Sequence, residues 1–436
     1  MSWKIKLVAA TIAISCSYKV SYAETVVDEV KKKEPWNLFS WFSFQSKDEN
    51  EAVKATRLLF WGSLNDPSST TKHLDEEVAS THISKTSVSR KSTLPRIAQV
   101  KCPDIQSVLY WKSSLAFLSK KGDVSLFHVD DAFGDSEPHQ LESGNVAFRG
   151  IALSPIGQKL LAWSQQGELF EAEFSESAVL NKVSRNWIGE HKVDHIHCGK
   201  SHCLALTKQG VVLSWGLSDS FGQLGRGQVT SEDNCETPGV VVVPKDIRVQ
   251  KVCCGDAHSA FLMEDGSVWT CGSNQWLQLG NKEEPWKDGN DYRPTPQRVQ
   301  GIGQRVATDI ACGAHHTLIL IKDGTVYSCG FGRWGQLGHH NYAQLSYLSR
   351  ISWLDGLRNG RIRDIAAGSN HSCLVTTDGK LYSLGANFAG QLGIGTLQPS
   401  AIPRLVKGLD HFHVEKVFCS GDWTAVVGFF EDSTNL

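Results

Sequence analysis

The sequence lacks the charge pattern that would indicate a nucleic-acid-binding protein. Its 44 basic and 46 acidic residues give a net charge of −2, and its longest basic run is the three lysines at 31–33. Nucleic-acid-binding domains usually carry a basic face or stripe. We therefore expect no nucleic acid among the partners of this chain.

The common catalytic motifs are missing as well. The sequence contains no Gly-x-Ser-x-Gly, no His-Glu-x-x-His, no P-loop motif that ends in Gly-Lys-Ser/Thr and no Cys-x-x-Cys. Residues 330–335 fit Gly-x-Gly-x-x-Gly, but a further turn motif follows them in place of the helix that a dinucleotide site requires. We predict no catalytic, cofactor-binding or metal-binding residues, no cofactor, and a protein that is not an enzyme.

Most of the 12 cysteines lie in apolar segments, where we expect them to be reduced and to act as small core side chains. This pattern favours the cytosol, the nucleus or the mitochondrial matrix over secretion. An alternative stays open, because two pairs in matching positions of two repeats, 254 with 271 and 312 with 329, are suited to disulfides. The eight cysteines in apolar segments are Cys203, Cys253, Cys254, Cys271, Cys312, Cys329, Cys373 and Cys419.

Residues 1–23 have the composition of a targeting sequence. Two lysines precede a short apolar run at 7–14, and no acidic residue occurs before Glu24. A mitochondrial presequence and a secretory signal both fit this pattern. The cysteines that are expected to be reduced favour mitochondria, and the secretory pathway remains the alternative.

Residues 24–56 form an aromatic linker. Aromatic rings that follow lysines are typical of a membrane interface, so this segment is a candidate for contact with a membrane surface. The alternative is a strand or short helix that covers one face of the following domain. The candidate membrane-interface residues are Trp36, Phe39, Trp41 and Phe42.

The rest of the chain is an internal repeat. Residues 198–216, 254–272, 312–330 and 367–385 align without gaps, and their leading glycines at 199, 255, 313 and 368 give periods of 56, 58 and 55 residues. Each unit has a short apolar run, a hairpin turn that is Asp-Gly in three of the four units, a β-branched or aromatic run, and a turn like Gly-Gln-Leu-Gly. Degraded units precede them at 109–127 and 152–170.

The seventh unit is divided between the two ends of the chain. Residues 419–427 match only the first half of a unit, and residues 58–65 resemble its missing half. Pairing of the two ends in one sheet would close a ring and protect its edge strands. We therefore predict an all-β, seven-bladed propeller over 57–428 with a tail at 429–436.

The order of these motifs resembles the repeats of the regulator-of-chromosome-condensation family. The resemblance covers residues 57–428, strongly over 195–428 and weakly over 95–175. It implies the seven-bladed propeller of that family. The chain looks most like mitochondrial members of the fungal type linked to assembly of the cytochrome bc1 complex, respiratory complex III.

Two sets of residues are candidates for a role in the repeat. The histidines occupy one position in four units, where a metal ring or an interblade hydrogen bond to backbone would explain them, and we favour the hydrogen bond. The glycines lead the same units. The candidates are His202, His258, His316, His371, Gly199, Gly255, Gly313 and Gly368.

The loop at 281–296 is a candidate for partner binding, since aromatic residues with acidic neighbours are suited to a protein interface. An ordinary solvated loop is the alternative. The candidate residues are Trp286, Asp288, Asp291 and Tyr292.

We expect a protein-binding scaffold at a mitochondrial membrane, with a role in respiratory-chain assembly. The alternatives are guanine-nucleotide exchange on a small GTPase, which the founding family member performs, and a secreted or lumenal binding propeller.

Overall fold

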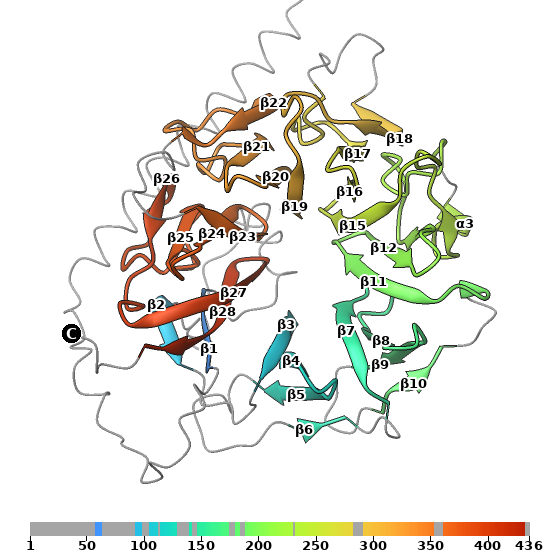
Figure 1. The fold of residues 1–436 in the computed structure, drawn as a ribbon, viewed down its shortest axis with the longest axis horizontal. Coiled ribbons are helices and arrows are strands. Elements are labelled where there is room, and N and C mark those ends of the chain that lie inside the picture. Colours follow the sequence, from blue (N-terminus) through green and yellow to red (C-terminus); the bar gives the residue numbers. More distant parts are fainter. Residues whose placement is uncertain are drawn as a thin grey trace, which may run out of the picture. The chain divides into compact units, whose positions relative to one another are not determined.

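Seven antiparallel four-stranded sheets follow one another around a ring in the computed structural model (Figure 1). The structure describes residues 57–62, 92–97, 104–111, 114–128, 139–141, 146–173, 179–183, 188–229, 232–281, 291–352 and 361–431. The predicted targeting sequence, the aromatic linker and the C-terminal residues 432–436 lie outside this part of the chain. No helix in the described part is long and apolar enough to cross a membrane.

Blades 1 to 3 are formed by consecutive segments. Blade 1 holds β3 (Ile105–Trp111), β4 (Ser114–Ser119), β5 (Val124–His128) and β6 (His139–Gln140). Blade 2 holds β7 (Phe148–Leu153), β8 (Leu160–Ser164), β9 (Leu169–Ala172) and β10 (Asn181–Lys182). Blade 3 holds β11 (Val193–Cys198), β12 (His202–Thr207), β13 (Val212–Gly216) and β14 (Gly239–Val240), with the one-turn helix α3 (Glu232–Cys235) before β14.

Blades 4 to 6 repeat this order. Blade 4 holds β15 (Val249–Cys254), β16 (His258–Met263), β17 (Val268–Ser273) and β18 (Tyr292–Arg298). Blade 5 holds β19 (Ala307–Cys312), β20 (His316–Ile321), β21 (Val326–Gly330) and β22 (Leu345–Arg350). Blade 6 holds β23 (Ile362–Ala367), β24 (His371–Thr376), β25 (Leu381–Gly385) and β26 (Ser400–Leu405).

Blade 7 joins the two ends of the chain, as the divided repeat predicted. Its strand order is β27 (Phe412–Ser420), β28 (Trp423–Phe430), β1 (Arg57–Gly62) and β2 (Ser92–Ile97). The β1 and β28 strands pair antiparallel over their full overlap, from Arg57 with Gly428 to Gly62 with Trp423. The seven-bladed propeller is therefore confirmed, and in Figure 1 the blue β1 lies in one sheet with the red β28.

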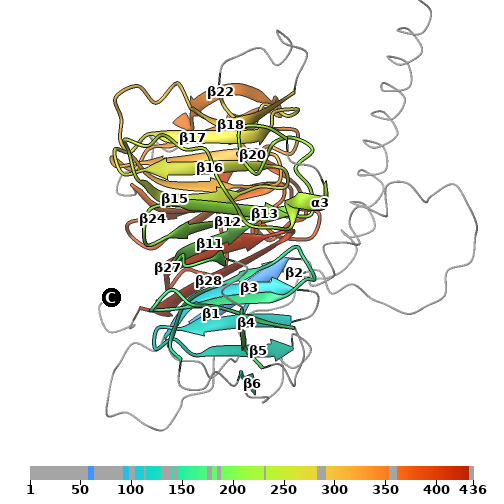
Figure 2. The same ribbon diagram turned by 90° about the vertical axis from the view of Figure 1, so that its right-hand side faces the viewer.

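The core of the ring lies between successive blades. At the closing junction, Leu58 and Phe60 of β1 and Trp423 of β28 belong to one buried cluster with Val108 and Phe117 of blade 1. The first strand of each blade lies nearest the centre of the ring in Figure 1, and the strands run across the thickness of the ring in Figure 2. Each of these seven first strands has a β-bulge near its start.

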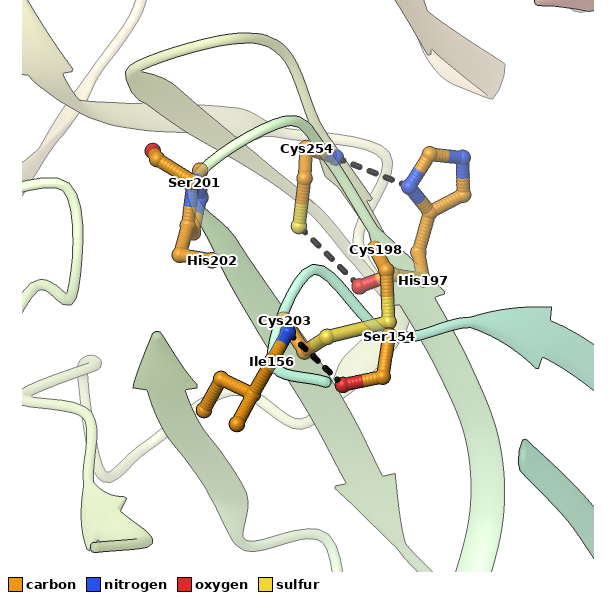
Figure 3. Close-up of a disulfide and its surroundings, with 8 residues drawn as sticks. All are labelled: Ser154, Ile156, His197, Cys198, Ser201, His202, Cys203 and Cys254. Atoms are coloured by element: carbon orange, nitrogen blue, oxygen red, sulfur yellow. Dashed lines mark hydrogen bonds between the residues drawn. A yellow bond between two sulfur atoms is a disulfide. The ribbon is translucent and has the colours of Figure 1, made fainter. Parts of the chain in front are cut away.

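One expectation about the cysteines was wrong. Cys203 is not a reduced core side chain, because it forms a disulfide with Cys198 (Figure 3). The two residues stand directly opposite each other on β11 and β12, with their Cα atoms 4.1 Å apart, and their sulfur atoms are joined across the two strands. The other seven cysteines predicted to be reduced are free, so the two disulfides considered within blades 4 and 5 do not form.

Candidate partner-binding face

A turn with an aromatic residue follows the third strand of blades 3, 4 and 5. In each turn the glutamine of the Gly-Gln-Leu-Gly-like motif holds the backbone of the aromatic residue two positions earlier. The backbone N–H of Trp276 donates to Gln278 Oε1 at 2.9 Å, and that of Trp334 donates to Gln336 Oε1 at 3.1 Å. Phe221 N–H makes the same bond at 3.1 Å. In blade 6 the backbone N–H of Ala389 donates to Gln391 Oε1 at 3.0 Å. The aromatic residue of this turn, Phe388, stands three positions before the glutamine.

A second side chain fixes three of these turns. Asp219, Asn274 and Asn387 each accept the backbone N–H of the leucine five residues later, at 2.9, 3.1 and 2.9 Å. All three side chains are buried, so these bonds are protected from water. The aromatic rings are therefore presented by turns of defined backbone conformation.

The four repeated histidines tie these turns to the next blade. His316 Nε2 lies 2.9 Å from Ser372 Oγ of blade 6, and this hydroxyl donates to the backbone carbonyl of Gln336 at 2.9 Å. Because the hydroxyl proton is used on the carbonyl, the imidazole Nε2 carries the proton that it donates to Oγ. We call this chain of histidine, hydroxyl and glutamine carbonyl the interblade relay.

The relay is repeated at four junctions with the same chemistry. The histidine-to-hydroxyl pairs are His202–Ser259 at 2.8 Å, His258–Thr317 at 3.1 Å, His316–Ser372 at 2.9 Å and His371–Thr424 at 2.9 Å. The sequence predicted a backbone partner for these histidines, whereas their direct partner is a side-chain hydroxyl that itself bonds the backbone. The relay joins blades 3 to 7.

Burial keeps the relay histidines neutral. It lowers the pKa of His202 and of His316 to about 3 and that of His371 to about 4, and it lowers the pKa of His258 well below 6.5. A charged imidazole would need a second acceptor at Nδ1. His258, His316 and His371 have no partner at Nδ1 among the described residues.

The leading glycines make room for these rings. A Cβ atom on Gly313 would lie 2.0 Å from His316 Cε1 and 2.6 Å from the backbone oxygen of Gly368. Gly255 and Gly368 are enclosed in the same way, and a Cβ on Gly199 would lie 1.9 Å from the backbone oxygen of Gly255. A side chain at these positions would push neighbouring blades apart.

The aromatic residues of neighbouring turns touch across the blade junctions. Trp276 of blade 4 contacts Phe331 of blade 5 edge to face, with ring centroids 5.0 Å apart. Trp334 of blade 5 contacts Phe388 of blade 6 in the same way at 4.9 Å. Phe388 is 43% exposed and the other three rings are half-buried. We call the four rings, together with Phe221 and the 50% exposed Leu217 of blade 3, the aromatic arc.

Two of the four residues predicted for partner binding lie beside this arc. Tyr292 begins β18 and pairs with Ser273, and the backbone carbonyl of Asp291, just before this strand, accepts the N–H of Asn274 at 2.6 Å. Both side chains are half-buried. Trp286 and Asp288 lie outside the described residues.

Sequence reasoning missed the aromatic arc, although a signal was present. Phe221, Trp276 and Trp334 all stand two positions before the glutamine of the repeated turn. A repeated motif that places an aromatic residue on several turns of one face would have predicted a binding surface.

Blades 1 and 2 lack the relay and use other contacts. At the junction of blades 2 and 3, Trp163 Nε1 donates to the backbone carbonyl of Asp194 at 2.9 Å, and Arg149 forms an ion pair with Asp194. At the junction of blades 7 and 1, Trp423 packs edge to face on Tyr110, with ring centroids 5.5 Å apart. A tryptophan therefore takes part in two of the junctions that lack the relay.

One group of metal-binding residue types occurs in the described part of the chain. A ligand atom of each of His371, Cys373 and Cys419 lies within 4.8 Å of the others. The imidazole is already committed to the relay through Thr424, as in three blades without these cysteines. Cys373 is also part of the apolar cluster at this junction. The group is explained by the relay and by core packing.

Comparison with known proteins gives the relatives of this fold. The chain is 34% identical to the ultraviolet-B receptor UVR8 of Arabidopsis thaliana over 236 residues, which cover 54% of this chain and 51% of the receptor. It is 32% identical to the human E3 ubiquitin-protein ligase HERC2 over 305 residues, which are 66% of this chain and 6% of the ligase. The chain thus spans about half of the first relative and a small part of the second.

Two solved structures have the same fold. Prp20p of Saccharomyces cerevisiae, which is described with its binding to Gsp1p and histones, has a TM-score of 0.67 at 20% identity, and the match covers 88% of this chain and 93% of Prp20p. Human WBSCR16 has a TM-score of 0.67 at 19% identity, over 86% of this chain and 99% of that protein.

The family model of the RCC1-like domain matches residues 156–429, which include blades 3 to 6 entire with their relay histidines and glutamine turns. This chain belongs to the family of RCC1-like propellers.

Proposed function

We propose that this propeller is a non-catalytic scaffold that binds a protein partner through the aromatic arc. The observation that carries the proposal is a set of partly exposed aromatic rings on consecutive blades, each presented by a turn whose backbone is held by the glutamine of the repeated motif. Rigid aromatic side chains lose little entropy on binding and are enriched at the energetic centres of protein interfaces.

We further propose a mitochondrial location for this scaffold and a role in assembly of the cytochrome bc1 complex. The basic, acid-free start of the sequence and its resemblance to mitochondrial relatives support this more specific role. Import of the full chain into isolated mitochondria, followed by protease protection, tests the location. Recovery of the chain in a secreted fraction would refute it.

Site-specific photo-crosslinking tests the binding surface. A photoreactive amino acid at Phe388 should link to one protein partner in cells, and the Trp276→Ala/Trp334→Ala double variant should weaken this link. The matched control is Val306, which is also 43% exposed but lies at the opposite end of the strands, beside the hairpin turns. Equal crosslinking from both positions would refute a binding face at the aromatic arc.

The identity of the crosslinked protein separates the scaffold from an exchange factor. If the partner is a small GTPase and the purified propeller accelerates release of its bound nucleotide, the non-catalytic role is wrong. If the partner is a component or assembly factor of complex III and no nucleotide release occurs, the proposed role is supported.

A further inference from the structure

A cavity of about 400 Å³ lies at the centre of the ring. Its lining residues come from blades 1, 2, 3, 4, 5 and 7, and most of them lie at the β-bulges that begin the first strands. The turns of the aromatic arc lie beside the opposite ends of these strands. The cavity is therefore a feature separate from the partner-binding face, and its volume is within the range of small-molecule sites.

Three cations line this cavity, and only two have a carboxylate partner. Arg149 forms an ion pair with Asp194, and Lys251 forms one with Asp309. Lys416 has no carboxylate within ion-pair distance among the described residues. Its Nζ is 3.4 Å from the backbone carbonyl oxygen of Gln106.

Asp364 is the carboxylate that acts most strongly on Lys416, but it forms no ion pair with it and is hydrogen-bonded to the backbone. Asp364 accepts the backbone N–H of Ile365 and of Val417, both at 3.1 Å. The Lys416 side chain is exposed, yet the surrounding chain removes part of its hydration and thereby lowers its pKa. The negative charge of Asp364 raises this pKa in part. An added anion near Lys416 would compensate its charge.

Two polar atoms of the lining residues are also without partners. Ser107 Oγ and His195 Nε2 are buried and form no hydrogen bond with the described residues. Burial lowers the pKa of His195 to about 3, with smaller contributions from His197 and from the positive charges of Lys251, Lys416 and Arg149. The imidazole is therefore neutral at physiological pH, and in the tautomer protonated at Nε2 it can donate one hydrogen bond to a ligand. Buried polar groups are normally satisfied, so such atoms indicate a missing partner.

The remaining wall is apolar and rigid. Trp163, Ile151 and Leu262 line it, and Trp163 is held by its hydrogen bond to the Asp194 carbonyl and by edge-to-face contact with His195. Gly150 is required here, because a Cβ on it would lie 1.9 Å from Trp163 Cζ2. The cavity thus has a cationic, hydrogen-bonding side and an aromatic side.

We propose that this axial cavity binds a small organic anion. Its carboxylate or phosphate group lies against Lys416, with Ser107 and His195 as hydrogen-bond donors, and its carbon skeleton lies against Trp163. A metal cation does not fit, since three of the four charged side chains in the lining are positive.

Isothermal titration calorimetry on the full chain tests this site with three probes: succinate, glycerol 3-phosphate and inorganic phosphate. We expect saturable binding of one molecule of succinate or glycerol 3-phosphate per chain, which identifies the anionic group, and weaker binding of inorganic phosphate. Lys416→Met should weaken binding about 10-fold or more, as expected for loss of a charge-assisted bond. Ser107→Ala, which leaves the charge unchanged, should weaken it by a smaller factor.

Lys322→Met is the matched control, because Lys322 is an exposed lysine in the β20–β21 hairpin at the same end of the strands. It should bind the probe like the unchanged chain at equal ionic strength. The proposal is overturned if none of the probes binds saturably, if only inorganic phosphate binds, or if Lys322→Met and Lys416→Met weaken binding equally. Unchanged binding in both Lys416→Met and Ser107→Ala would also overturn it.

Discussion

Mild acid should destabilise this propeller through the relay histidines. Their pKa values in the folded chain lie below the value of about 6.5 for an unfolded chain, so below pH 6.5 the unfolded state binds more protons than the folded state. The stabilisation from their neutral form is therefore complete above pH 6.5. It is lost as the pH falls from there toward 4 and 3.

The size of this effect follows from the pKa values. For His316, with a pKa of about 3, the free energy of unfolding should fall by about 2 kcal/mol between pH 7.5 and pH 5.0. His202 and His371, at about 3 and about 4, should each lose a similar amount, about 6 kcal/mol for the three. This is a large part of the stability of a typical domain.

Urea unfolding at pH 7.5 and at pH 5.0 measures the effect. His316→Gln should be less stable than the unchanged chain at pH 7.5, because the smaller glutamine side chain leaves part of the buried space of the imidazole unfilled. Its further loss between the two pH values should be smaller by about 2 kcal/mol than that of the unchanged chain. His411→Gln, at an exposed position, is the control and should leave the difference between the two pH values unchanged. An equal loss in His316→Gln and in the unchanged chain would refute the role of the buried neutral imidazole.

Three further substitutions have defined outcomes in urea titrations. Gly313→Ala should destabilise by about 3 kcal/mol or more, since its Cβ would overlap the imidazole and a backbone oxygen of blade 6, whereas Gly408→Ala, with open space around it but a φ of +78°, should cost about 1 kcal/mol. Reduction of the bond between Cys198 and Cys203 should lower the stability by about 2 kcal/mol, and the Cys203→Ala variant should not respond to reductant. Trp61→Phe should cost about 2 kcal/mol, because it removes a buried indole hydrogen bond of 2.9 Å and leaves a void, and no change in the urea midpoint would contradict this.

The blades could be predicted from the sequence because each repeat carries its own local signals. The hairpin glycines, the alternation of apolar runs and the fixed period all act within one blade. The divided seventh blade was predictable for the same reason, since the halves at 58–65 and 419–427 complete one pattern.

Prediction of the interblade relay requires a comparison of two successive repeats. Its acceptor stands directly after the next repeated histidine, as Ser259 follows His258 and Ser372 follows His371. The residue after a histidine therefore accepts a hydrogen bond from the preceding blade, whereas the histidine itself donates to the following blade. A sequence pattern shows such pairs but does not show which blade each side chain faces.

The axial cavity was beyond sequence reasoning for a geometric reason. Its residues lie about one repeat apart in the chain, and the β-bulges bring side chains such as Arg149 and Lys416 toward a common centre. The Cys198–Cys203 disulfide depends likewise on a strand register that the sequence does not specify.

Closure of the ring by the two chain ends is the central claim about this fold, and the axial cavity depends on it because its lining includes residues of blades 7 and 1. Hydrogen exchange of the full chain tests it most directly, because amides in one stable sheet open together. We expect the paired amides of β1, around Leu59, to exchange as slowly as those of β28, around Val426. Exchange of the β1 amides within seconds, while β28 stays protected, would contradict the closed ring.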